Sequence, residues 1–161
     1  MLDYVNLRTD KRASHEFPGE VAPLDFFGED GVYLVHLAPG QDSPRLVVWN
    51  TKTGQVNDLM RIPAGDISLV PVRGHPAGFV RPDGRYVLLA LRSMAGQGSD
   101  LWVLDLVEKR ATVAYPNARF AFGGVRWAGD CAVLYGQGVP LSVGLPDASA
   151  HRIDLVREAG G

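Results

Sequence analysis

The chain has 161 residues, which is about the length of one domain, and its 16 Lys and Arg nearly balance its 18 Asp and Glu. That balance argues against a protein that binds nucleic acid or a membrane surface through bulk charge. A hydrophobic content of 46% supports a packed core and argues against disorder. The 19 Gly and 11 Pro interrupt the chain so often that they favour many short strands over long helices. A single cysteine, Cys131, excludes an intrachain disulfide and a cysteine-based zinc cluster.

The N-terminal residues show no basic segment followed by an apolar one, as a secretory signal would. The longest apolar stretches, such as 86–91, are far shorter than the ~20 residues that a membrane helix needs. We therefore expect a soluble cytoplasmic protein that binds no membrane, with Cys131 as a buried thiol. No cofactor or metal site is expected.

One hairpin pattern occurs three times along the chain. The segments 2–7, 46–51 and 101–106 are each rich in β-branched, aromatic or leucine residues, and an Asn or Asp comes next to last in each. Each is followed by a polar turn, a second segment and a proline, and Lys52–Gly54 is one of these turns. The polar residue marks the point where the strand leaves the core for a tight turn.

A different hairpin precedes this pattern, and a similar one occurs near the C-terminus. Its turns are predicted at Gly28–Gly31, Arg81–Gly84 and Ala128–Asp130, because Glu-Asp-Gly and Pro-Asp-Gly are strong turn signals. The second strand of each is a nearly continuous apolar run, as in 86–91. Such runs are typical of strands that are buried on both faces.

The two hairpins together make a unit of four strands in about 40–55 residues, which is typical of β-propeller blades. Residues 77–116 resemble the repeat of TolB-like and WD40-like propellers, which is also found in the propeller domain of prolyl oligopeptidases. The resemblance is good there, fair over 23–63 and weak over 124–157. It implies an all-β, antiparallel, partial or small propeller within one domain, 1–161. We expect a half-blade at 1–18 and blades at about 21–63, 76–117 and 120–157, with 147–158 either a strand or a capped helix.

Closed propellers need at least ~4 blades, and this chain supplies three and a half. A small or open arrangement, a partner chain that completes the ring, or a fragment of a larger propeller would each account for this. Because Tyr4, Val5 and Leu7 require burial, we expect the half-blade to lie beside a sheet edge. A dimer or complex is therefore predicted, with more than ~1,000 Å² buried through residues 2–7 or the strands near Val143 and Ile153.

No nucleophile elbow, zinc-protease motif, P-loop or Rossmann fingerprint occurs in the sequence, so no catalytic residue is predicted. Trp49, Trp102 and Trp127 are interpreted as core residues. Any binding site should lie in the loops on one face of the propeller, where rigid scaffolds usually carry function. The polar side chains with reach in those loops are Asp42, Asp66, Arg73, His75, Asp100 and Arg119.

These observations favour a non-catalytic module for protein interaction or a scaffold, binding a protein partner or a second copy of itself. The alternative is a hydrolase or lyase, or an accessory propeller of a hydrolase, that acts through the loop face. Nucleic acid is disfavoured, because no basic patch is interleaved with aromatic residues.

Overall fold

The structure, a computed structural model, describes residues 1–63, 77–92, 98–118, 122–136 and 140–153. The described residues form β-strands, turns and loops, with no helix among them, so the predicted all-β class is confirmed. In particular, they include no helix with the length and apolarity needed to cross a membrane. The strands are β1 Leu2–Asn6, β2 Lys11–His15, β3 Glu20–Phe27, β4 Gly31–Leu37, β5 Arg45–Asn50, β6 Val56–Arg61, β7 Ala77–Val80, β8 Tyr86–Arg92, β9 Ser99–Asp105, β10 Arg110–Ala118, β11 Phe122–Ala128, β12 Cys131–Gly136, β13 Leu141–Gly144 and β14 Ala150–Arg152.

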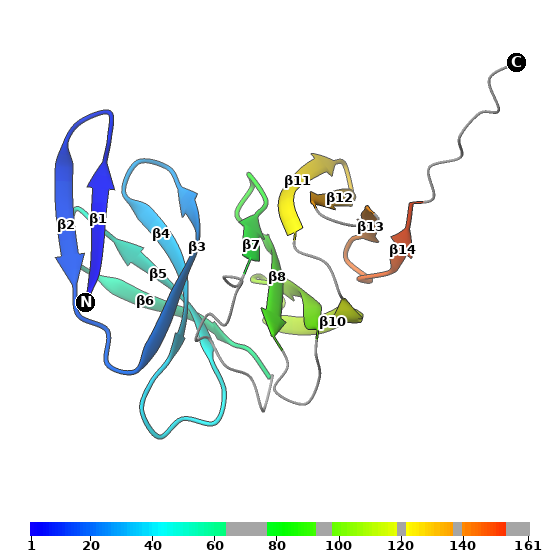
Figure 1. Cartoon of the computed structure of the whole chain (residues 1–161), viewed down its shortest axis with the longest axis horizontal. Helices are drawn as coiled ribbons and strands as arrows, with labels where there is room; N and C mark the ends of the chain where they lie inside the picture. Colours follow the sequence, from blue (N-terminus) through cyan, green and yellow to red (C-terminus); the bar gives the residue numbers. More distant parts are fainter. Residues whose placement is uncertain (64–76, 93–97, 119–121, 137–139, 154–161) are drawn as a thin grey trace, which may run out of the picture.

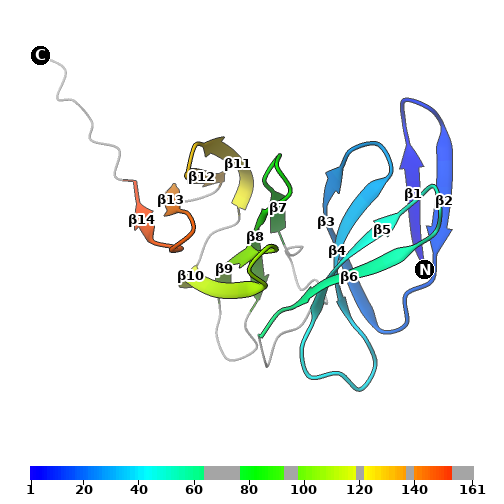
Figure 2. The same cartoon turned by 180° about the vertical axis from the view of Figure 1, so that it is seen from behind.

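The strands form one two-stranded sheet and three four-stranded sheets, all antiparallel between chain neighbours. We call them the N-terminal hairpin (β1–β2), the first sheet (β3–β6), the second sheet (β7–β10) and the third sheet (β11–β14). Figures 1 and 2 show them side by side in chain order, with the N-terminus at one end of the row and the C-terminus at the other. This order is that of consecutive propeller-like blades.

The predicted turns are confirmed at the three hairpins. The β3–β4 turn lies at 28–30, the β5–β6 turn at 51–53 and the β7–β8 turn at 82–85. Gly84 adopts a φ of 74°, which other residues rarely adopt, and its amide donates to the carbonyl of Arg81 at 2.8 Å. The Pro-Asp-Gly signal thus works through glycine at this position.

The core lies between the sheets, and β8 supplies both sides of it. Val87, Leu89 and Leu91 pack toward the first sheet, whereas Tyr86 and Leu88 pack toward the third. Because side chains alternate along a strand, a continuous apolar run buries both of its faces. The continuous runs therefore predicted correctly that β4 and β8 are buried on both faces. The prediction was wrong for β12, which belongs to the last described sheet and buries only Ala132 and Leu134.

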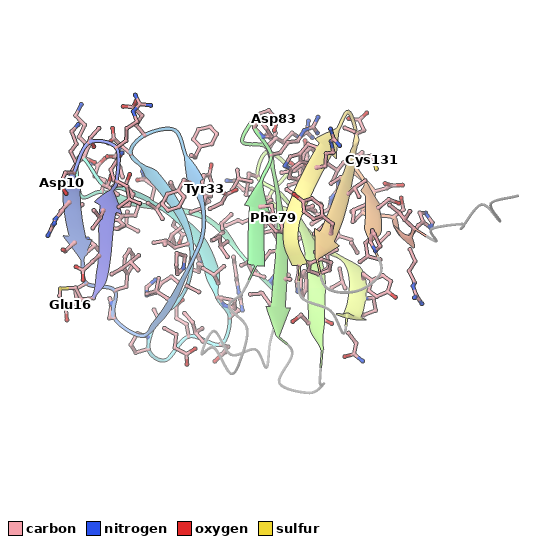
Figure 3. All side chains as sticks on the ribbon, turned by 45° about the horizontal axis from the view of Figure 1, so that its top comes forward. Asp10, Glu16, Tyr33, Phe79, Asp83 and Cys131 are labelled. Atoms are coloured by element: carbon pink, nitrogen blue, oxygen red, sulfur yellow. The ribbon has the colours of Figure 1, made fainter. Side chains whose placement is uncertain are left out.

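Neighbouring sheets also meet through polar contacts and through the aromatic residues at the end of β3. The Asp25 carboxylate accepts a hydrogen bond from the Val80 amide across the first and second sheets, at 2.9 Å. Phe27 packs on Tyr33 and lies beside Gly84 of the next sheet. Figure 3 shows Tyr33 between these two sheets, and Asp10 and Asp83 at one common edge of the row, opposite Glu16.

Two of the three tryptophans, Trp49 and Trp102, are buried. Trp49 packs toward the N-terminal hairpin and Trp102 toward the first sheet, so each faces the preceding unit. Trp127 is half-buried against the core between the second and third sheets. All three therefore pack in the core, as predicted. Of the segment 147–158, residues 150–152 form a strand, and 154–158 lie outside the described residues.

The N-terminal hairpin differs from its expectation. It packs face-on against the first sheet through Leu2, Tyr4 and Ala13. Within the described chain, its strands β1 and β2 pair only with each other. The expected burial of Val5 and Leu7 was wrong for this chain alone, because their side chains are 44% and 95% exposed. Val5 alternates with Tyr4 and so lies on the face of the hairpin away from the first sheet.

Candidate functional site

The strand-ending Asn or Asp has the same role in three units. The side-chain Oδ1 of Asn6, Asn50 and Asp105 accepts hydrogen bonds from the backbone amides two and three residues later, at 3.0–3.1 Å. Such Asx turns fix the chain reversal between the third and fourth strands of a unit. They identify Asn6 as the counterpart of Asn50 and Asp105, and β1 as the counterpart of β5 and β9. In the third sheet the corresponding position at the end of β13 is Gly144, which pairs with Cys131 at the start of β12.

The residue after this position makes a second repeated contact in each complete sheet. The amides of Thr51, Leu106 and Leu145 donate to the carbonyls of Asp30, Arg85 and Asp130, at 2.8–2.9 Å. These carbonyls lie just before the second strand of each sheet. The counterpart of these amides in the N-terminal hairpin is that of Leu7, which has no hydrogen-bond acceptor within the described residues.

One edge of β1 is therefore a free sheet edge in the described chain. The strands β5, β9 and β13 each have a second strand on the side away from the fourth strand, namely β4, β8 and β12. On that side β1 has none. By the alternation of a strand, the amide of Val5 faces the same way as that of Leu7, so this edge presents a row of unpaired backbone groups.

A cavity of about 300 Å³ lies between the N-terminal hairpin and the turns of the first sheet. One side is formed by β1 and β2, and the other by the β3–β4 and β5–β6 turns. The lining residues are Tyr4, Asn6, Lys11, Arg12, Ala13, Glu29, Asp30, Thr51 and Lys52.

The cavity coincides with a difference between the repeats. Leu106 and Leu145 are the counterparts of Thr51. Leu106 packs in the core between the first and second sheets, and Leu145 packs in the core between the second and third sheets. Thr51 is shorter, and its hydroxyl donates to the Asp30 carbonyl at 3.2 Å instead of reaching toward the hairpin. The side chain that fills the other two interfaces is therefore missing at this one.

We predict that Thr51→Leu will raise the melting temperature, because the leucine fills this cavity as Leu106 and Leu145 fill the other interfaces. A gain of about 1 kcal/mol is expected from added apolar burial, net of one lost hydrogen bond, or about 2–4 °C in a chain of this size. Differential scanning calorimetry would measure it. Thr51→Val, which removes the hydroxyl and keeps nearly the same side-chain size, is the control. Equal melting temperatures for the two variants would contradict the prediction.

The charged groups around the cavity are not paired with one another. Lys11 and Lys52 make no ion pair in the described structure, and neither do the carboxylates of Glu29 and Asp30. Arg12 lies 3.7 Å from Asp10, in a contact exposed to solvent. By contrast, the hydroxyl of Tyr4 is engaged, since it donates to the Glu29 carbonyl at 3.3 Å.

A second concentration of charge lies at the corresponding end of the second sheet. Arg85 donates to the 3%-exposed Asp105 at 3.1 Å, and the guanidinium groups of Arg81 and Arg85 lie over the Tyr86 ring. Burial by itself raises the pKa of Asp105, but the hydrogen bond from Arg85 and two from backbone amides outweigh it, so the pKa lies below its ordinary value. These bonds hold the turn together, so this cluster is structural.

Of the predicted loop residues, Asp42 and Asp100 lie within the described chain. Asp42 is exposed in the β4–β5 loop. Asp100 belongs to β9, a correction to its expected place in a loop, and its Oδ1 accepts a hydrogen bond from the Asn117 amide at 2.8 Å. Asp66, Arg73, His75 and Arg119 lie outside the described residues.

The described residues contain no group of three or more His, Cys, Asp or Glu that could hold a metal ion. The cavity was not predicted from the sequence, because the polar residues with reach lie in the loops between the second and third strands and between the units. The available signal was Thr51 in the place of Leu106 and Leu145, and it becomes visible once the three units are aligned on their turns.

The chain matches no protein-family model and no curated protein. Among solved structures it is similar to a chain from a study of two prolyl endopeptidases and the role of inter-domain dynamics in their catalysis and specificity. The TM-score is 0.56 and the identity 15%, over 94% of this chain and 23% of that one. The chain thus spans less than a quarter of that protein, and the similarity supports a propeller-like fold.

Proposed function

We propose that this chain is a propeller-like module for protein interaction, and that it binds its partner through the free edge of β1. The observation that carries this is that β1 pairs with a strand on one side only in the described chain, whereas its counterparts β5, β9 and β13 pair on both sides. The proposed partner contributes an extended strand, which pairs with the backbone groups of β1 as β4 pairs with β5. Strand addition of this kind obtains affinity from main-chain hydrogen bonds and selectivity from side chains.

The chain offers a surrogate for the partner strand. A peptide that copies residues 20–37 contains β4, which pairs with β5, and β3, which pairs with β4. Because β1 is the counterpart of β5, this peptide has the strand geometry that the free edge requires. A fluorescent label at its N-terminus would allow binding to the full chain to be followed by anisotropy.

We expect this peptide to bind the wild-type chain, and Val5→Pro to weaken binding about tenfold or more. Proline removes an amide that faces the free edge, and edge strands tolerate proline where the amide faces outward. Val5→Thr, which keeps the amide, is the matched control and should bind like the wild type. Circular dichroism checks that each variant is folded. No binding by the wild-type chain, or equal binding by Val5→Pro and Val5→Thr, would overturn the proposal.

We also propose that the partner is in some conditions a second copy of the chain, through residues 2–7 or the third sheet near Val143 and Ile153. Light scattering at micromolar concentration tests this directly. A dimer in the wild type that becomes a monomer in Val5→Pro would support the β1 edge as the contact. A strictly monomeric wild type would leave only a different protein as the partner.

A second candidate function is an accessory propeller of a hydrolase. The similarity to a prolyl endopeptidase chain favours it, and Asp42 of the β4–β5 loop and Asp100 near the start of β9 would then belong to the face that meets the hydrolase. Under either proposal we place the chain in the cytoplasm, as one domain with a half-blade and three blades. Substitution of Asp42 with Lys should weaken binding to a hydrolase partner and leave binding of the 20–37 peptide unchanged.

A further inference from the structure

We infer that the cavity between the N-terminal hairpin and the first sheet is a binding site for a small zwitterion, such as an amino acid or a short peptide with free termini. The site is distinct from the β1 edge, because it lies on the face of the hairpin that meets the first sheet. The inference therefore does not depend on the proposed function. It rests on three observations about the cavity, namely its origin, its charges and its size.

The origin of the cavity is local to one interface. The fold has three interfaces of the same construction, and two of them carry Leu106 and Leu145 where the third carries Thr51. The cavity lies at the interface with the threonine and is lined by it. The cavity is partly open to solvent, and charged and polar side chains line it beside Tyr4 and Ala13. Polar groups in such a site can fix the orientation of a ligand.

The charges select the ligand class. Lys11 belongs to β2 on one side of the cavity, and Glu29 and Asp30 belong to the turn on the other side, next to Lys52. Arg12 is opposite Val5 in the ladder, so its side chain lies on the outer face of the hairpin. An anion would meet the two carboxylates, and a cation would meet the two lysines, so a ligand with one kind of charge is disfavoured. A molecule with an ammonium group at one end and a carboxylate at the other can pair with both sides.

The size agrees with this class. A volume of about 300 Å³ is at the lower end of the range for small-molecule pockets, which fits a ligand of about two amino-acid residues. The engaged groups also limit what the ligand contacts. The Tyr4 and Thr51 hydroxyls are bonded to backbone carbonyls, so the four unpaired charges of Lys11, Lys52, Glu29 and Asp30 remain as its partners.

The experiment uses the dipeptide alanylalanine with the ¹⁵N-labelled full chain, followed by amide chemical shifts. We expect saturable shifts at Asn6, Thr51 and Lys52, with a dissociation constant of about 1 mM or below. N-acetyl-alanylalanine and alanylalanine amide each lack one charge, and each should bind about tenfold more weakly. Thr51→Leu should abolish the shifts while it keeps the fold, and Thr51→Val should retain them.

Two results would overturn the inference. One is the absence of saturable shifts at about 10 mM dipeptide, where a 1 mM site would be mostly filled. The other is equal binding by the zwitterion and its two capped forms, since charge would then not select the ligand. Val5→Pro should leave dipeptide binding unchanged, so a failure of the β1 proposal and a failure of this one give different results.

Discussion

Replacement of Leu88 or Leu89 with alanine is expected to destabilise the chain by about 2–5 kcal/mol in each case. Both side chains are fully buried, but they belong to different interfaces. Leu89 packs between the first and second sheets, and Leu88 packs between the second and third. Each truncation removes apolar contacts and leaves a cavity that close-packed neighbours fill only in part.

Urea unfolding at neutral pH would measure the loss as a shift in the midpoint concentration. Val113→Ala is the control, because Val113 lies on the outer strand β10 with 40% of its side chain exposed, and it should change stability by less than about 0.5 kcal/mol. A cost below about 1 kcal/mol at either leucine would mean that one face of β8 is not packed. The arrangement of sheets described above would then be wrong at that interface.

Asp105→Ala is expected to destabilise the chain by about 2–3 kcal/mol, less than the 3–5 of a fully buried pair because Arg85 is partly exposed. The substitution removes the ion pair with Arg85 and the Asx turn to Val107 and Glu108. Asp105→Asn should cost about half as much, because its side-chain oxygen can still accept both amides. Asn6 and Asn50 already make the same turn in other units.

The difference between the wild type and Asp105→Asn should depend on pH. The pKa of Asp105 is lowered in the folded chain, so its carboxylate contributes stability above its unfolded pKa of about 3.9. That contribution is lost as pH falls through the lower folded pKa. Urea midpoints for both chains, measured from neutral pH down to acid, should therefore converge below about pH 4. A constant difference across this range would show that the charge of Asp105 contributes nothing.

The strands could be predicted from the sequence because local and long-range signals agree. The apolar runs at 32–37 and 86–91 lie in second strands, and the Pro-Asp-Gly signal lies at a turn with a glycine at positive φ. The alternation of buried faces then follows from the geometry of a strand. Even the strand-ending Asn50 and Asp105 were visible, although their hydrogen bonds to the following amides were not.

The site could not be predicted in the same way, because it depends on which units become neighbours. The ion pair joins Arg85 of the β7–β8 turn to Asp105 at the end of β9, and the cavity joins the hairpin to turns that lie well apart from it in the sequence. Neither leaves a short motif. The exposure of Leu7 was also not predictable, since an apolar residue at the start of a turn is read as a residue of the strand.

Among the described residues, the core clusters each join one sheet to its neighbour in chain order. Folding energy in such an array is a sum of unit terms and nearest-neighbour terms, as in linear repeat proteins. The hydrogen bonds that Asp105 and Leu106 make at the turn are to residues of the same unit. A gene duplication or deletion of one whole unit therefore keeps these bonds intact. A lineage can lengthen or shorten such a chain by one unit and inherit interfaces that already fit.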